Sequence, residues 1–194
     1  MKICRMNQKE IPGDDFAFYQ SLFQLKNLYR QGWLHSGIDR EVCESIADHS
    51  FALAMLCLKY EKEYPLALDT EKMIKMALIH DLAESIIGDF IPAENISTED
   101  KFIQEKQAIQ SVLSHFPDSE GLCEIWLEFE AGDTPTGAYV KQMDKIEMLL
   151  QALVYQQNKN VDLSSFFVST ESQMKNEFFQ SLRMTILKSA GFES

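Results

Sequence analysis

Residues 73–84 read MIKMALIHDLAE, and this stretch determines the kind of fold that the chain can adopt. Its apolar residues recur at helical spacing and Asp69 ahead of it is a typical N-cap, so a buried helix is expected here. His80, Asp81 and Glu84 fall where this apolar helix gives way to a loop. Imidazole and carboxylate groups together suit Mn, Fe, Co, Ni or Zn, so the end of the helix is a candidate metal site.

The same periodicity extends outward in both directions and predicts an all-α protein. Scarce glycine (8) and proline (5) disfavour a turn-rich all-β fold. Irregular segments are expected around Gly32 and from Ser85 to Asn95, and Thr170 to Gln173 fits a capping box. About seven helices are expected in one domain, residues 1–194, at about Asp14 or Asp15 to Arg30, Ser45 to Tyr60, Asp69 to Leu82, Ser97 or Thr98 to His115, Ser119 to Phe129, Thr134 to Gln156, and 170–188.

The composition is typical of a globular domain, with 45% hydrophobic and 25% charged residues in a chain of 194. The 18 basic and 30 acidic residues leave a net charge of −12, which disfavours nucleic acid or an anionic membrane as a partner. No run approaches the roughly 18 apolar residues of a membrane span. An anionic small substrate would need local positive charge from a metal ion or from a few placed Arg and Lys side chains.

The pattern of cysteines and the composition of residues 1–10 indicate the cellular compartment in which the protein is expected. Cys4, Cys43, Cys57 and Cys123 form no Cys-x-x-Cys pair, so a cysteine zinc cluster is not expected. Scattered thiols of this kind are typical of a reducing compartment. Residues 1–10 contain no apolar segment and so predict no signal peptide. We therefore expect a cytoplasmic protein.

Four side chains stand out as metal ligands: His49, His80, Asp81 and Asp144. Adjacent residues of a helix point about 100° apart, so His80 and Asp81 can share one ion only at a helix end that other helices meet. His49 and Asp144 are the candidates from those other helices. The alternative is that His80 is an ordinary buried histidine with a hydrogen-bond partner.

His49, His80-Asp81 and Asp144 resemble the His…His-Asp…Asp signature of the HD-domain metal phosphohydrolases. The surrounding residues are similar to one branch of that family, the HD-domain 5′-deoxynucleotidases. The resemblance covers about residues 16–156, and the C-terminal helix adds little to it. The matching segments are Leu25 to Trp33, Glu44 to Ser50, Ala77 to Glu84, Gly88-Asp89 with Pro92 to Ile96, and Val140 to Lys145.

The resemblance implies a helical HD domain with one divalent cation (Mn, Co, Mg, Fe or Zn) held by His49, His80, Asp81 and Asp144. It also implies hydrolysis of deoxyribonucleoside 5′-monophosphates to the nucleoside and phosphate, by a homodimer. A divalent ion polarises phosphoryl oxygens and lowers the pKa of a bound water. No nucleic-acid or membrane partner is implied.

Two positions match substrate-binding residues of the family. Arg30 matches its phosphate-contacting arginine, and a guanidinium can clamp a phosphate bidentately. Trp33 matches an aromatic residue near the sugar, where bulk would exclude a ribose 2′-hydroxyl. Gln31 and Gly32 separate the two here, whereas the pair is adjacent in some relatives. Glu94 stands where many relatives carry Asp.

Glu84 and Asp89 match acidic residues beside the family's metal. Glu84 shares a helix face with His80 and Asp81, so we predict that Glu84 orients the attacking water or takes its proton, with Asp89 second. A rival role for both is to hold a second ion such as Mg, and the plain alternative is a solvated loop acid. The roles of three further residues stay open. Asp48 either orients His49 or is a solvated acid, and Lys141 either contacts the phosphate or balances nearby acidic charge. Glu147 either supports the metal site or forms an ion pair on the helix surface.

Two other functions remain alternatives. One keeps the fold but changes the substrate to a nucleoside triphosphate, a cyclic dinucleotide or an alarmone. Alarmone hydrolases carry His-Asp-x-x-Glu-Asp, whereas Ser85 follows Glu84 here, and the Gly-Tyr-Pro motif of the cyclic dinucleotide branch is missing. The other is a non-catalytic nucleotide- or metal-binding module, which the filled ligand positions disfavour.

Overall fold

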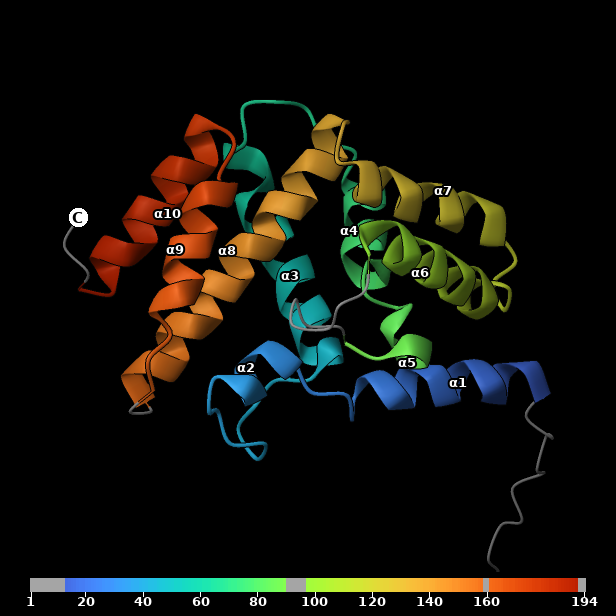
Figure 1. Cartoon of the computed structure of the whole chain (residues 1–194). Coiled ribbons are helices and arrows are strands. Elements are labelled where there is room, and N and C mark those ends of the chain that lie inside the picture. The colour runs from blue at the N-terminus through green and yellow to red at the C-terminus, as the bar shows by residue number, and fades with distance from the viewer. Residues whose placement is uncertain (1–12, 90–96, 159–160, 192–194) are drawn as a thin grey trace, which may run out of the picture.

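The computed structural model describes residues 13–89, 97–158 and 161–191, which form an all-α structure (Figure 1). The described residues contain no β-strand, and an isolated antiparallel bridge joins Tyr29 to Ser45. The predicted all-α class is therefore confirmed. The helices are α1 (Gly13–Leu25), α2 (Gln31–His35), α3 (Ile46–Tyr60), the 3-10 turn η1 (Glu61–Glu63), α4 (Thr70–Ile79), α5 (Glu84–Ile87), α6 (Thr98–Leu113), α7 (Ser119–Ala131), α8 (Pro135–Asn158), α9 (Ser164–Gln173) and α10 (Glu177–Ser189).

Helices α3, α4 and α8 form the centre of the domain. α3 packs against both α4 and α8, and α8 is the long helix that crosses Figure 1 diagonally. Each of the three helices contributes a fully buried side chain to one apolar cluster, namely Leu53, Met73 and Met143. Burying an apolar side chain of this size contributes about 1.5–3 kcal/mol. Apolar contact therefore holds together the three segments that carry the predicted metal ligands.

Two pairs of helices cover this centre on either side (Figure 1). On one side α7 contacts α4, α6 and α8, and its buried Trp126 stacks on Phe102 of α6 with ring centroids 5.9 Å apart. On the other side α9 and α10 lie along α8, where Phe179 packs 5.6 Å from Tyr139. The C-terminal helices therefore flank the same helix that carries Asp144.

Side-chain caps confirm several predicted helix starts. Ser45 Oγ accepts a hydrogen bond from the Asp48 amide, and the Asp48 carboxylate accepts from the Ser45 amide, which is a complete capping box. Asp69, Ser97 and Thr134 each accept from a backbone amide three residues further on. Asp48 is therefore engaged in a cap, which answers the question that the sequence left open about this residue.

The first helix ends at Leu25 and not near Arg30, so the predicted end was wrong. Residues beyond it leave the helix because their backbone pairs with the segment ahead of α3: the Arg30 amide donates to Glu44 O over 3.1 Å, and the Ile46 amide donates to Leu28 O over 2.9 Å. α2 then begins at Gln31, within the segment expected to be a loop. Arg30 thus lies at the start of a short helix and beside α3. Asp14 and Asp15 lie inside α1 and do not precede it.

The apolar helix expected from Asp69 to Leu82 ends at Ile79. The Leu82 amide donates to Ile79 O three residues back, in a tighter turn than the helix before it. The single turn α5 follows, within the stretch expected to be irregular, and stops at Gly88, whose φ of +84° favours glycine. His80 and Asp81 therefore lie in a turn and not in a regular helix.

The C-terminal prediction of one helix over 170–188 was wrong. Thr170 lies inside α9, where its hydroxyl donates to Phe167 O, so it does not cap a helix. The chain leaves the helix after Gln173 because the Lys175 amide donates to the side-chain oxygen of Gln142 in α8. Asn176 then caps α10 by accepting from the Phe179 amide.

Some predictions fall on residues that the structure does not describe. They concern the absence of a signal peptide at residues 1–10, Cys4, and the segment Pro92 to Ile96 with its Glu94. Among the residues that are described, no helix has both the length and the apolar character needed to cross a membrane.

Candidate metal centre

The predicted metal ligands meet where α4 ends. His49 comes from α3, His80 and Asp81 come from the turn after α4, and ligand atoms of these three residues all lie within 4.8 Å of one another. The two imidazole Nε2 atoms are 3.3 Å apart, and His80 Nε2 is 3.1 Å from Asp81 Oδ2. Asp144 approaches from α8, with Oδ1 3.2 Å from His49 Nε2. The fold thus brings together residues that are far apart in the sequence.

An acceptor holds the outer nitrogen of each histidine. His80 Nδ1 donates to Ala77 O over 2.9 Å, and His49 Nδ1 lies 2.6 Å from Glu147 Oε2. Such partners select the tautomer whose Nε2 is free to bind a cation, and they fix the orientation of the ring. Both rings are buried and cannot turn away.

The charges of the cluster also suit a cation. Burial opposes ionisation of the acids, but His80 and Arg30 hold the pKa of Asp81 below its usual value, and Lys145 and His49 hold that of Asp144 well below it. Burial and Arg30 lower the pKa of His49, whereas hydrogen bonds to Asp144 and Glu147 raise it to about 10. Surroundings that favour a proton on this imidazole also favour a divalent ion in its place. The nitrogen and oxygen donors therefore fit the predicted cation.

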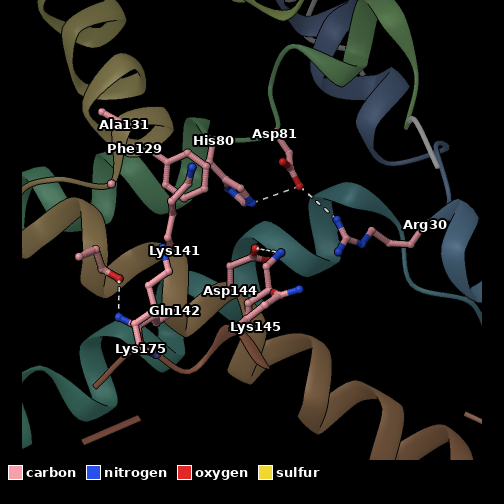
Figure 2. Close-up of a pocket in the computed structure, with 13 residues that line it drawn as sticks. Arg30, His80, Asp81, Phe129, Ala131, Lys141, Gln142, Asp144, Lys145 and Lys175 are labelled. Carbon is pink, nitrogen blue, oxygen red and sulfur yellow. Dashed lines mark hydrogen bonds and ion pairs between the residues drawn. The ribbon is translucent and has the colours of Figure 1, made fainter. Parts of the chain in front are cut away.

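Arg30 lies next to the cluster, at the N-cap of α2. Its Nη1 is 3.2 Å from Asp81 Oδ2, and Figure 2 shows Asp81 joined to His80 on one side and to Arg30 on the other. Burial disfavours the charged guanidinium, but Asp81 and Asp144 raise the pKa of Arg30 above its ordinary value. The side chain is therefore a permanent cation beside the candidate metal ligands.

A cavity of about 420 Å³ opens onto this cluster. Arg30, His80, Asp81 and Asp144 form one end of its wall (Figure 2). The rest of the wall comes from α7, α8 and the end of α9: Phe129, Ala131, Gly132, Ala138, Lys141, Gln142, Lys145, Gln173 and Lys175. Pockets of about 300–1,000 Å³ are the usual size for small-molecule ligands.

Neither of the two predicted catalytic acids, Glu84 and Asp89, is among the residues that line this cavity. Glu84 Oε2 is buried and has no hydrogen-bond partner in the described part of the chain. Burial, with Asp81 and Asp89 nearby, raises the pKa of Glu84 well above its usual value. Asp89 is more constrained, because its Oδ2 accepts from the Gln31 amide over 2.6 Å. Burial also raises the pKa of Asp89.

Trp33 is placed differently from the other predicted site residues. Its ring is 2% exposed, stacks on Phe166 at 4.2 Å and meets Tyr155 edge-on, so it is not part of the cavity lining. Its indole nitrogen donates to Glu44 Oε1 over 2.7 Å. The structure thus shows Trp33 as an anchor for α2, whose N-cap is Arg30.

The structure adds residues that sequence reasoning left open or missed. Glu147 is 3% exposed and hydrogen-bonded to His49, and its position three residues after Asp144 on one helix was the signal for it. Lys145 pairs with Asp144 at 2.8 Å. Lys141 lines the cavity, and its ammonium donates to Glu130 O. Gln173 reaches the cavity from α9, and no pattern in the sequence marked it.

Comparison with known proteins identifies the family. A sequence model described as the HD domain matches residues 22–183. A 5′-deoxynucleotidase HDDC2 of Dictyostelium discoideum is 35% identical over 181 residues, which are 87% of this chain and 94% of that protein. A 5′-deoxynucleotidase hdd1 of Schizosaccharomyces pombe is 37% identical over 157 residues, 77% of each chain.

Solved structures agree with this result. The crystal structure of the PH0347 protein from Pyrococcus horikoshii has a TM-score of 0.75 and 29% sequence identity, and the match covers 92% of this chain and 99% of that one. A conserved hypothetical protein from Pyrococcus furiosus has a TM-score of 0.70 at 29% identity, with 91% and 98% covered.

Proposed function

This chain belongs to the HD domain family, and from that premise we propose that it is a metal-dependent 5′-deoxynucleotidase. The reaction is the hydrolysis of deoxyribonucleoside 5′-monophosphates to the deoxynucleoside and phosphate. The observation that carries the proposal is the cluster of His49, His80 and Asp81 at the end of a nucleotide-sized cavity that Arg30 also lines. The similarity to proteins named 5′-deoxynucleotidase over most of the chain supports the same substrate class.

His49, His80, Asp81 and Asp144 would hold the divalent ion, with Mn, Co, Mg, Fe and Zn as candidates. When bound, such an ion polarises the phosphoryl group and makes water a better nucleophile. Glu147 keeps the His49 ring oriented through the contact at Nδ1. The protein thus contributes a fixed, buried set of donors.

Arg30 would bind the substrate phosphate. Asp81 would help to hold the divalent ion, which would leave the guanidinium of Arg30 available to phosphoryl oxygens as a bidentate donor. The side chain is held in place because α2 is anchored by the buried Trp33. We therefore assign Trp33 a positioning role, and its predicted effect on the ribose 2′-hydroxyl would follow from the placement of α2.

Glu84 would take the proton from the attacking water. Its buried Oε2 has no hydrogen-bond partner among the described residues, and its raised pKa makes it a stronger base than a solvated carboxylate. Asp89 already accepts from the Gln31 amide, so we place it second. Ligation of a second ion by Glu84 and Asp89 is the rival role, and it predicts more than one ion per chain in the loaded protein.

The test measures phosphate release from deoxynucleoside and ribonucleoside 5′-monophosphates. The protein is stripped by a chelator and resupplied with Mn, Co, Mg or Zn, with Asp81→Ala as the inactive variant and Asp39→Ala, in the exposed turn before α3, as its matched control. Metal-restored turnover of the deoxy substrates only, lost in Asp81→Ala, is expected. Turnover of triphosphates or diesters alone would replace the substrate class, and metal binding without any turnover would make the chain a binding module.

We also propose a homodimer in the cytoplasm. Phe51, Met55 and Leu58 lie 65%, 51% and 43% exposed on the outer face of α3, with helical spacing that forms one apolar stripe. Light scattering should give twice the chain mass for the native protein and a monomer for Phe51→Asp, and a monomeric native protein would refute the dimer.

Cys43, Cys57 and Cys123 are free thiols, which supports a reducing compartment.

A further inference from the structure

We propose that Lys175, in the short connection between α9 and α10, is a specificity residue whose unpaired ammonium favours dianionic phosphate ligands of the cavity over neutral ones. The inference rests on the proposed function and adds a residue that acts through its charge. Lys175 needs no direct contact with a phosphate at the metal site, because the attraction between charges extends over several ångströms.

The first observation is the charge of the cavity wall. The chain as a whole has a net charge of −12, yet the wall carries more basic than acidic side chains. Its two acids, Asp81 and Asp144, are both candidate ligands of a divalent cation. The basic residues of the wall are Arg30, Lys141, Lys145 and Lys175. A cleft lined by one sign of charge concentrates ligands of the opposite sign, so this wall suits an anion.

Lys175 differs from the other three basic residues because they already have partners inside the protein. The pairs are Arg30 with Asp81 at 3.2 Å, Lys145 with Asp144 at 2.8 Å, and Lys141 with the carbonyl oxygen of Glu130 at 2.7 Å. The Lys175 side chain is exposed, and its ammonium makes no hydrogen bond or ion pair with any described residue. Its charge is therefore the one in this wall that no partner offsets.

The backbone of Lys175 is fixed to the cavity wall although its side chain is exposed. Its amide donates to Gln142 Oε1 over 2.8 Å, and Gln142 is 6% exposed and lines the same cavity (Figure 2). On either side of Lys175 in the chain, Met174 is 5% exposed and Asn176 caps α10. The flexible part is therefore the side chain alone, and its charge stays at the cavity.

The ligand group that this charge favours is a phosphate monoester. Such a group carries a charge of about −1.5 to −2 at pH 7, whereas the sugar and the base of a nucleotide are neutral. Salt screens the attraction between exposed charges, with a Debye length of about 10 Å at 0.1 M and about 3 Å at 1 M. The contribution of Lys175 should therefore be present at low salt and disappear at high salt.

The test compares an anionic ligand with a neutral one in the variant Lys175→Gln, which removes the charge and keeps a polar side chain. The ligands are inorganic phosphate and thymidine, the two products of the proposed reaction on thymidine 5′-monophosphate. At low salt the Kd of phosphate for the metal-loaded protein should rise about 2- to 5-fold, as for an exposed ion pair. The Kd of phosphate at 1 M salt, and that of thymidine at either salt concentration, should match the native protein.

Two further variants separate the position of the charge from its presence. Lys188→Gln changes the net charge by the same amount, but Lys188 is an exposed residue of α10 outside the cavity lining, so phosphate binding should be unchanged. Lys175→Arg keeps the charge and should retain the native Kd of phosphate. An equal loss in Lys188→Gln, an equal loss in Lys175→Arg, or weaker thymidine binding in Lys175→Gln would each overturn the inference.

The same measurements distinguish this inference from the proposed function, because phosphate binding requires no turnover. Phosphate binding that Lys175→Gln weakens only at low salt, in a protein that hydrolyses no nucleotide, would refute the nucleotidase and support the role of Lys175. In an active enzyme, Lys175→Gln should raise KM for thymidine 5′-monophosphate at low salt with little change in kcat. Hydrolysis with an identical KM at low salt would refute the role of Lys175 and leave the nucleotidase in place.

Discussion

Replacing Glu147 with Gln should weaken metal binding without unfolding the protein. The carboxylate lies 2.6 Å from His49 Nδ1 and is 3% exposed, so it acts on the metal site through this ring. Loss of such a partner typically costs 10- to 100-fold in metal affinity, about 1.4 to 2.8 kcal/mol. Glu147 is also one of the groups that raise the pKa of His49 to about 10, against burial and Arg30, so its removal eases loss of the proton that the metal displaces. At neutral pH the loss of the ring's partner weakens metal binding, whereas the easier loss of the proton strengthens it. We therefore expect metal affinity to fall by the lower end of this range, about tenfold.

The assay is a competition titration of Mn²⁺ against a chelating indicator, with thermal midpoints measured in parallel with and without the ion. A saturating concentration of Mn²⁺ should raise the thermal midpoint of both proteins, but Glu147→Gln should need a Mn²⁺ concentration about ten times higher to reach this effect. Glu71→Gln, which removes an exposed carboxylate paired with Lys75, is the control and should match the native protein. Unchanged affinity in Glu147→Gln, or an equal loss in Glu71→Gln, would refute a role for Glu147 in the site.

Three further predictions concern catalysis and stability. Arg30→Lys should raise KM about tenfold or more in steady-state assays because an ammonium cannot bind phosphate bidentately, whereas an unchanged KM would exclude the phosphate contact. Burial raises the pKa of Glu84 above 4.5, and a general base must be unprotonated, so kcat/KM should fall as the pH drops through that raised pKa. An acid limb of the pH–rate profile at the ordinary carboxylate pKa would contradict the assignment. Glu84→Gln should abolish turnover while the metal still binds. Leu53→Ala, at a fully buried position, should lower the free energy of unfolding by about 2–5 kcal/mol in denaturant titration, and a loss below about 1 kcal/mol would mean that α3 is not part of the core.

Local sequence signals predicted helix starts correctly where the interacting groups all lie within one short segment. Ser45, Asp69 and Ser97 were predicted as helix starts, and each caps a helix, because an N-cap depends on a side chain and an amide three residues away. The same reasoning failed at Thr170, whose capping pattern is outweighed when the Lys175 amide bonds to Gln142, 33 positions away in the chain. It also failed at Arg30, where pairing with Glu44 ended the first helix early.

The sequence by itself determined the helical class and the residue types of the candidate metal site, because periodicity and side-chain chemistry are written in the order of residues. The tertiary structure alone decided that His49 and Glu147, 98 positions apart, share a hydrogen bond, and that Gln173 reaches the same cavity as Asp81. It also decided that Trp33 anchors α2 from the interior. These relations depend on how α3, α8 and α9 pack, and packing arises from the sum of many apolar contacts that no local pattern encodes.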